Sequence, residues 1–245
     1  MKKLTRLTIF AFLFSISSSI CESNSSINVG ADLMSRYIFR GVDYGHSPSI
    51  QPTFAFKNGN FEIGYWGAIA LNSSYQETDL YLKYSIGSFS IMVTDYYIPT
   101  LNDNPAAPDI RYFTFDDKKT AHTLEGTLSY QFGEAFPLKI AANVFFYGND
   151  KRWGYDDDKD SKEDTYYSSY FELGYPIKVG GNNVDAFIGF TPAAGAFGNT
   201  MGVVNMGFTG YKSVKISDSF ELPVKSSIIF NPQAENVFFI FGITL

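Results

Sequence analysis

The chain has 245 residues, of which 18% are charged and 18% aromatic, and its formal net charge is −6. This length allows one large domain or two small ones, and the acidic balance argues against nucleic acid as a partner. No internal run of about 20 apolar residues occurs, which argues against a transmembrane helix in the mature chain. The mean hydropathy of −0.07 fits a soluble protein. It fits equally well a barrel whose apolar outer face and polar inner face cancel.

The first residues have the three parts of a bacterial secretory signal peptide. Residues 1–6 are basic, residues 7–14 are apolar, and the stretch that follows is small and polar. Residues 1–23 are therefore predicted to be the signal peptide and residues 24–245 the mature domain. Cys21 leaves open a lipoprotein alternative, in which this cysteine carries the lipid.

The mature sequence alternates apolar and polar residues with a period of two, which is typical of β-strands with one apolar face. In the first segment, 27–41, the apolar face comprises Ile27, Val29, Ala31, Leu33, Tyr37 and Phe39. The polar face comprises Asn28, Asp32, Arg36 and Arg40. The alternation recurs in segments 50–57, 61–71, 77–86, 89–99, 122–132, 138–148, 165–176, 184–192, 201–212, 220–231 and 236–245. The sequence therefore predicts an all-β fold of about twelve strands.

Three positions conflict with this pattern. Asp95 falls on the apolar face of segment 89–99, either because it lies at a membrane rim or because a bulge shifts the phase. Pro52 and Pro223 interrupt segments where a backbone donor is wanted, so the strand count is uncertain by about two.

The predicted connections differ in length between the two ends of the sheet. Those after odd-numbered strands include two long acidic stretches, 100–120 and 149–164, whereas those after even-numbered strands are short and rich in Gly and Asn. This asymmetry is typical of an outer-membrane barrel. A bilayer also tolerates only a closed sheet, because an open edge leaves backbone groups unpaired in hydrocarbon. The predicted fold of residues 24–245 is therefore a transmembrane antiparallel up-and-down β-barrel.

The last segment presents alternate apolar residues up to the end of the sequence. On its apolar face lie Val237, Phe239, Phe241, Ile243 and Leu245. This pattern resembles the C-terminal assembly signal of outer-membrane barrels, although that signal usually ends in Phe. The resemblance implies periplasmic chaperones and the barrel-assembly machinery as partners, beside outer-membrane lipid and lipopolysaccharide. The alternative is an ordinary last strand of a soluble sheet.

A more specific motif begins in the first strand. It consists of Asp32, Ser35-Arg36-Tyr37, Phe39-Arg40-Gly41, Pro48 and Gln51-Pro52. Together these residues resemble the N-terminal signature of the TorF-type porins of Gram-negative bacteria. The motif covers only this region, while chain length, signal peptide and strand rhythm fit throughout. The resemblance implies a channel in the bacterial outer membrane and does not specify its solute.

Charged residues recur on the polar face of the predicted strands, where a closed barrel places them in its lumen. The predicted pore-lining residues are Asp32, Arg36, Arg40, Glu62, Glu77, Asp79, Lys83, Glu125, Lys139 and Glu172. Residues four apart on one strand are separated by about 13 Å, so Asp32, Arg36 and Arg40 must pair with charges on other strands. Such charges either join the lumen walls by ion pairs or form a charged constriction that selects solutes, and the two roles are compatible.

The second acidic loop offers a candidate calcium site at Asp156, Asp158 and Asp160, because hard cations prefer several carboxylates. The run lacks the glycine and the spacing of an EF-hand loop. A solvated acidic outer loop is the favoured interpretation, and no metal or cofactor is predicted.

The predicted function is passive diffusion of small solutes or ions through the charged lumen. One alternative is a non-conducting structural or adhesive barrel that acts through its outer loops. Another is an outer-membrane hydrolase that uses His46 or His122, the only histidines. No nucleophile motif accompanies either histidine, so the chain is not predicted to be an enzyme.

Overall fold

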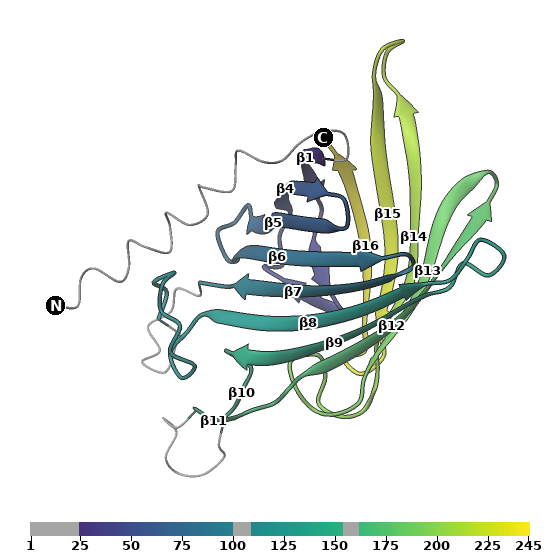
Figure 1. Ribbon diagram of the computed structural model, residues 1–245. Coiled ribbons are helices and arrows are strands. Elements are labelled where there is room, and N and C mark those ends of the chain that lie inside the picture. Colours follow the sequence, from purple (N-terminus) through teal and green to yellow (C-terminus); the bar gives the residue numbers. More distant parts are fainter. Residues whose placement is uncertain (1–24, 100–108, 154–161) are drawn as a thin grey trace.

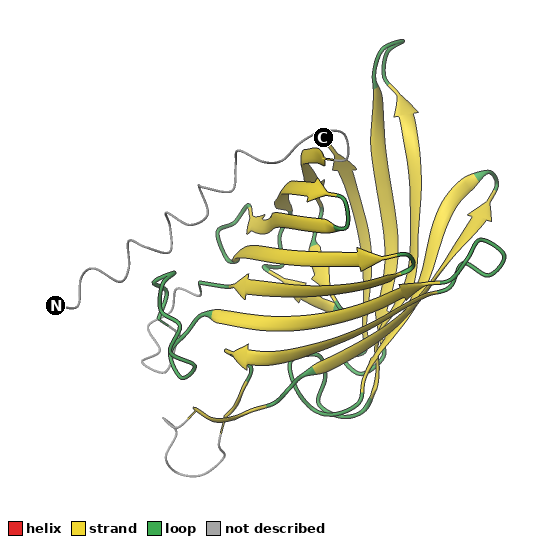
Figure 2. Ribbon diagram, viewed as in Figure 1, coloured by secondary structure: helices red, strands yellow, loops and turns green. Residues whose placement is uncertain are grey.

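The computed structural model describes residues 25–99, 109–153 and 162–245. Twelve strands close into one antiparallel barrel, and two small hairpins are separate from it (Figure 1). All regular secondary structure in this part of the chain is strand (Figure 2). The described residues contain no helix of the length and apolar character needed to cross a membrane. The structure thus confirms the predicted all-β fold and its closed, antiparallel barrel. The predicted signal peptide and the predicted calcium candidate Asp156, Asp158 and Asp160 lie outside the described residues.

Each barrel strand pairs with the next barrel strand along the chain, and β1 closes the barrel against β16. The barrel strands are β1 (Ser25–Met34), β4 (Ser49–Asn58), β5 (Phe61–Ala70), β6 (Gln76–Ile86), β7 (Phe89–Tyr97), β8 (His122–Gln131), β9 (Lys139–Gly148), β12 (Ser169–Val179), β13 (Asn182–Thr191), β14 (Gly202–Lys215), β15 (Glu221–Asn231) and β16 (Asn236–Thr244). The small hairpins are β2 (Tyr37–Phe39) with β3 (Val42–Tyr44), and β10 (Lys151–Trp153) with β11 (Lys162–Thr165).

The period of two in the sequence separates an apolar outer wall from a polar inner wall. Every barrel strand except β15 exposes at least two large apolar side chains, among them Val29 at 69%, Leu82 at 53% and Phe239 at 76%. On the opposite face, Glu125 and Asn143 are buried inside the barrel. These side chains form an apolar belt that is interrupted at β15, and exposed apolar surface of this extent marks an interaction surface.

The connections are sorted by length, as predicted. At one end, called the long-loop end here, the connections include 35–48, 98–121, 149–168 and 192–201. At the other, the short-turn end, the longest connection is 132–138.

The barrel closes over a short seam between β1 and β16. Three residue pairs join these strands, whereas ten join β1 and β4. Two further backbone bonds link Ala31 with Leu245. Asp32 strengthens the seam, because Lys225 Nζ lies 2.5 Å from its Oδ2 and the Thr244 hydroxyl donates to its Oδ1 at 2.6 Å.

The predicted first strand is wrong in its second half. β1 ends at Met34, and residues 35–48 leave the wall and form the β2–β3 hairpin. Arg40 and Gly41 both have positive φ, 51° and 83°, and form the two-residue turn between the paired residues Phe39 and Val42. A turn of this type reverses the chain tightly, and the hairpin keeps the same two-residue alternation as a continuing strand. The sequence pattern alone therefore did not reveal where the wall ends.

Pro52 and Pro223 lie at positions where the missing N–H group costs the strand pairing little. In β4, the pairing with β5 is interrupted between Ile50 and Thr53, which flank Pro52. In β15, pairing with β16 begins only at Val224, so Pro223 lies beyond the reach of that neighbour. The eighth predicted strand also begins later than expected, since 162–165 belongs to the β10–β11 hairpin.

Candidate constriction in the barrel lumen

The β2–β3 hairpin crosses the inside of the barrel. At its turn, Arg40 forms a two-pronged ion pair with Glu125 of β8, with Nη1–Oε2 and Nη2–Oε1 distances of 2.5 and 2.9 Å. In the order of strands around the barrel, β8 lies almost opposite β1, from which the hairpin departs. The hairpin therefore spans the lumen, and the ion pair fastens its turn to the far wall.

Both charged groups of this pair are removed from water. The Arg40 and Glu125 side chains are only 9% and 1% exposed. Burial lowers the pKa of Arg40, but its hydrogen bonds and attraction to Glu125 outweigh burial and raise the pKa. The Tyr96 hydroxyl donates a further bond to Glu125 Oε1 at 3.1 Å. Arg40 is therefore a permanent cation held in a fixed position.

Aromatic rings surround the Arg40 guanidinium. Its central carbon lies 4.5 Å from the ring centre of Phe39, 4.7 Å from that of Tyr170 and 4.8 Å from that of Phe197. The negative faces of such rings attract a cation, and the attraction strengthens when water is excluded. These contacts add to the ion pair in holding the turn of the hairpin.

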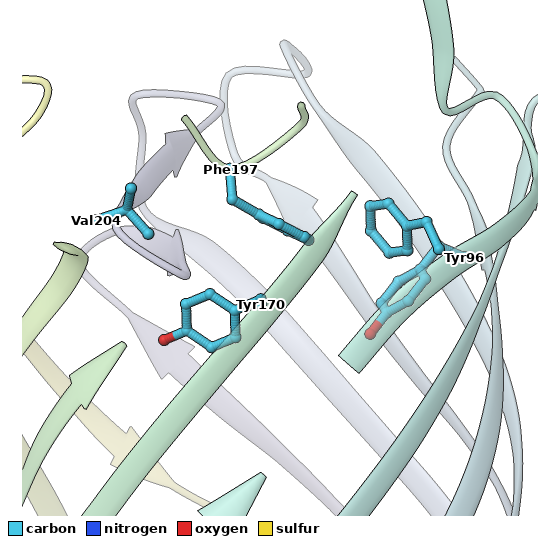
Figure 3. Packing of buried hydrophobic residues seen from close by; sticks show 5 residues of the cluster. Tyr96, Tyr170, Phe197 and Val204 are labelled. Atoms are coloured by element: carbon cyan, nitrogen blue, oxygen red, sulfur yellow. The ribbon is translucent and has the colours of Figure 1, made fainter. Parts of the chain in front are cut away.

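An apolar cluster lies in the lumen around this turn, towards the long-loop end (Figure 3). Its buried members are Tyr96, Phe145, Tyr170, Phe197 and Val204, and Phe39 and Ile98 pack against them. They come from β7, β9, β12, β14 and the connections, so the cluster joins several walls of the barrel. The cluster and the hairpin narrow the lumen at this level, and a cavity of about 140 Å³ lined by Phe39, Tyr96 and Phe145 remains beside them.

The base of the hairpin packs on a second aromatic group. Tyr37 lies 5.2 Å from Trp66 of β5 and 5.6 Å from Tyr44, and Tyr44 lies 5.0 Å from Tyr75, measured between ring centres. Burial and the nearby Glu77 raise the pKa of Tyr44 to about 12 and that of Tyr37 well above its usual value. These rings therefore stay neutral at physiological pH and serve as packing groups.

The hairpin turn packs directly against the barrel wall at Gly41. A Cβ atom on Gly41 would lie 2.0 Å from the backbone oxygen of Val204, and the residue has φ of +83°. The Asn231 side chain donates a bond of 3.1 Å to the Gly41 carbonyl. Glycine is thus required at this position both by backbone conformation and by the close approach to β14.

Two buried carboxyl groups lie on the wall beside the hairpin. Glu77 and Asp79 of β6 are 3% and 5% exposed, and no ion pair to either is found in the described residues. The Tyr75 hydroxyl donates to Glu77 Oε2 at 2.7 Å. One oxygen of the other carboxyl group, Asp79 Oδ1, is buried without a hydrogen-bond partner among the described residues. The long-loop half of the lumen is therefore acidic apart from Arg40.

The other predicted pore-lining residues are distributed over different parts of the barrel. Asp32 holds the β1–β16 seam, as described above. Arg36, expected on the inner face of the first strand, instead pairs with Asp43 of β3, and its side chain is 44% exposed. Glu62 accepts a bond of 2.9 Å from the Tyr81 hydroxyl. Lys83, Lys139 and Glu172 line a cavity nearer the short-turn end.

Sequence reasoning missed most of the apolar cluster and misplaced part of the hairpin. Tyr37 and Phe39 were expected on the outer face, yet they lie inside the barrel. Tyr96 and Phe145 lie on the inward phase of their strands, which is the signal that could have identified them. Phe197 lies in a connection rich in Gly and Ala and carries no periodic signal.

The two histidines lie away from the lumen cluster. His122 is fully buried at the start of β8. The Nδ1 atom of His122 lies 2.8 and 3.0 Å from the two carboxylate oxygens of Asp95. Its Nε2 lies 2.6 Å from the backbone oxygen of Tyr112. The His46 side chain is 77% exposed and contacts Asp43. Both ring nitrogens of His122 thus have hydrogen-bond partners within the protein.

Asp95 keeps the outward phase that its position in the sequence gives it. Its pairing with β6 and β8 runs without a shift, so no bulge changes its phase. It lies on the outer face near the long-loop end, where His122 pairs with it.

Comparison with known proteins gives no further assignment. No protein-family model matches the chain, and no curated protein matches it. Among the described residues, no group of three or more His, Cys, Asp or Glu side chains is placed to hold a metal ion.

Proposed function

We propose that the chain is an outer-membrane channel for ions and small solutes, with a lumen narrowed by the β2–β3 hairpin. The observation that carries this proposal is a closed barrel with an apolar belt outside and charged groups inside. A bilayer requires such closure, and a wet lumen explains the inward charges. The predicted signal peptide and the resemblance to TorF-type porins support the same setting.

The narrowest part of the route is set by the hairpin and the wall it touches. A solute that enters from the long-loop end meets the turn of the hairpin, which the buried Arg40–Glu125 pair fastens to the wall, and beside it the wall that carries Glu77 and Asp79. Fixed charges at a narrow point select ions by sign, and packed rings limit size. The proposed channel therefore passes only small solutes, with a conductance well below that of an unobstructed barrel.

The membrane setting can be tested with a charge on the outer wall. Leu82 is 53% exposed near the middle of β6. We expect Leu82→Arg to lower the folding stability in lipid vesicles by about 2–4 kcal/mol, because the charge would lie in hydrocarbon. Urea unfolding in vesicles, followed by gel migration with and without heating, measures this loss.

The matched control is Asn28→Arg, which adds the same cation on the polar inner face of β1, where Asn28 is exposed. This variant is expected to fold with nearly unchanged stability. Equal stability of the wild type and the Leu82→Arg variant in vesicles would contradict the membrane setting.

A second function is favoured by one observation, the apolar cluster that lies in the lumen around Arg40. A barrel blocked at this level would not conduct and would act through its outer loops as a structural or adhesive protein. The two functions differ in whether the wild-type chain carries current.

Single-channel recording in a planar bilayer separates them. The mature chain is compared with a variant in which residues 36–44 are replaced by a Gly/Ser linker of equal length. We expect small, ion-selective steps from the wild type and severalfold larger steps from the variant. If the wild type folds but carries no current while the variant does, the hairpin is a plug and the second function is favoured. If neither conducts, the channel proposal is wrong.

A further inference from the structure

A separate cavity of about 490 Å³ lies between the hairpin and the short-turn end. Its lining comes from β6, β7, β8, β9 and β12, which are consecutive around the barrel. This cavity contains none of the residues of the ion pair or the apolar cluster. It is called the lumen cup here.

Hydroxyl groups form a row along one level of the cup. Ser85 of β6 pairs with Ser90 of β7, and Ser90 pairs with Ser129 of β8. The Ser90 and Ser129 hydroxyl oxygens lie 2.6 Å apart. Side chains of paired residues on neighbouring strands lie next to each other, so three hydroxyls are presented together to the cup. One of the Ser90 and Ser129 hydroxyls donates to the other, so two hydroxyl protons of the row remain to donate to an oxygen of a bound solute.

Two lysines flank the serine row. Lys83 lies two residues before Ser85, deeper in the barrel, and Lys139 lies two residues before Ala141, towards the short-turn end. Both line the cup. Glu62 is paired with Lys83 in the strand register, and its carboxylate accepts a hydrogen bond from the Tyr81 hydroxyl. Within the described part of the chain, neither lysine forms an ion pair.

The lining contains a single carboxylate, Glu172, against the two lysines. Glu172 accepts hydrogen bonds from the Tyr170 hydroxyl and, at 3.4 Å, from the Asn205 amide. The cup therefore contains two ammonium groups, three hydroxyls and one carboxylate that is already engaged. Its formal charge is positive, whereas the lumen beside the hairpin is acidic.

We propose that the lumen cup binds a small dianion, such as a dicarboxylate or a phosphate, through Lys83, Lys139 and the serine row. An ammonium group attracts an anion more strongly in a recess with limited water than in bulk solvent. Two cations on different strands favour a solute with two negative charges over one with a single charge. The inference deepens the proposed function by naming a solute class, and it rests on that function only for the route by which the solute arrives.

Binding can be measured without any current. The refolded chain in zwitterionic detergent micelles at low salt is titrated with succinate, with inorganic phosphate and with uncharged glucose, by calorimetry. We expect both dianions to bind and glucose not to bind. Lys83→Gln and Lys139→Gln should each weaken dianion binding by about tenfold, which corresponds to about 1.4 kcal/mol. Heat-dependent gel migration confirms that each variant is folded.

Lys178→Gln is the matched control, because it removes one positive charge from β12 outside the cup. It should leave binding unchanged. No binding of either dianion to the folded wild type would overturn the inference, whatever the bilayer recordings show. Equal loss in Lys178→Gln would also overturn it, since general charge attraction would then explain the binding. A chain that conducts but binds no dianion would agree with the channel proposal and contradict only the proposed anion site in the lumen cup.

Discussion

Replacing Gly41 with alanine is expected to release the β2–β3 hairpin from the wall and to increase the conductance of the barrel severalfold. The added Cβ atom would lie 2.0 Å from the Val204 backbone oxygen, a distance that no real contact reaches. The obstacle is backbone of a barrel strand, so it cannot rotate away. The hairpin can move, because its only covalent links to the wall are the connections before and after it.

Gly59 provides a control for the strain of the turn. It also has positive φ, 58°, but a Cβ atom added there would have no other atom within 4 Å. Alanine in the left-handed region costs about 1–2 kcal/mol at either site. Of these two sites, only Gly41 has the clash. The difference between the two variants therefore measures how the clash affects the packing of the hairpin against the wall.

Two measurements follow the hairpin. Single-channel recording reports the size of the steps, and limited trypsin digestion reports whether the peptide bond after Arg40 is accessible. Gly41→Ala should show larger steps and rapid cleavage after Arg40, whereas Gly59→Ala should match the wild type in both. Wild-type conductance and protection in the Gly41→Ala variant would mean that the hairpin does not control the lumen.

The barrel walls were predictable from the sequence because each strand follows one simple rule. A wall with an apolar outside and a polar inside imposes a period of two, and tight turns such as Asn58-Gly59 mark the ends of the strands. The predicted segments 77–86 and 122–132 therefore differ from β6 and β8 by only one residue at one end. The sorting of long and short connections followed from the same pattern.

The constriction was only partly predictable, because it depends on contacts between distant segments. Arg40 and Glu125 were both predicted to line the lumen, but nothing in the sequence indicates that they meet across it. The inward turn at Arg40-Gly41 keeps the alternation of a strand, so Tyr37 and Phe39 were assigned to the outer face. Phe197 reaches the cluster from an irregular connection. Contacts of this kind depend on the closed shape of the barrel, which local patterns do not encode.

Removing Glu125 alone is expected to disrupt the constriction more than removing both members of its ion pair. In Glu125→Leu, Arg40 would remain as an unpaired cation among apolar rings, since its guanidinium cannot lose its proton. Breaking a buried pair in this way costs about 3–5 kcal/mol. The hairpin avoids this cost by leaving the wall, so the loss should appear as larger conductance steps and as cleavage after Arg40.

The double variant Arg40→Leu/Glu125→Leu leaves no unpaired charge. The leucine at position 40 would then lie among Phe39, Tyr170 and Phe197, which already form an apolar surface. Replacing a buried ion pair with apolar residues of similar volume is often neutral or stabilising. The double variant is therefore expected to regain small conductance steps. Conductance is the readout for both variants that lack Arg40, because trypsin has no cleavage site at that position in them.

Arg40→Leu completes the cycle and should have an intermediate effect. Glu125 would keep the Tyr96 hydroxyl as a donor at 3.1 Å, so its carboxyl group would not be left without a partner. The Thr127 hydroxyl lies 3.2 Å from Glu125 but closer, 2.9 Å, to Asn143 Oδ1. Hairpin release should therefore be greatest in Glu125→Leu, smaller in Arg40→Leu and smallest in the double variant. If the double variant conducted as strongly as Glu125→Leu, charge pairing would be required to seat the hairpin, and apolar packing would not replace it. If Glu125→Leu behaved like the wild type, the ion pair would have no part in closing the lumen.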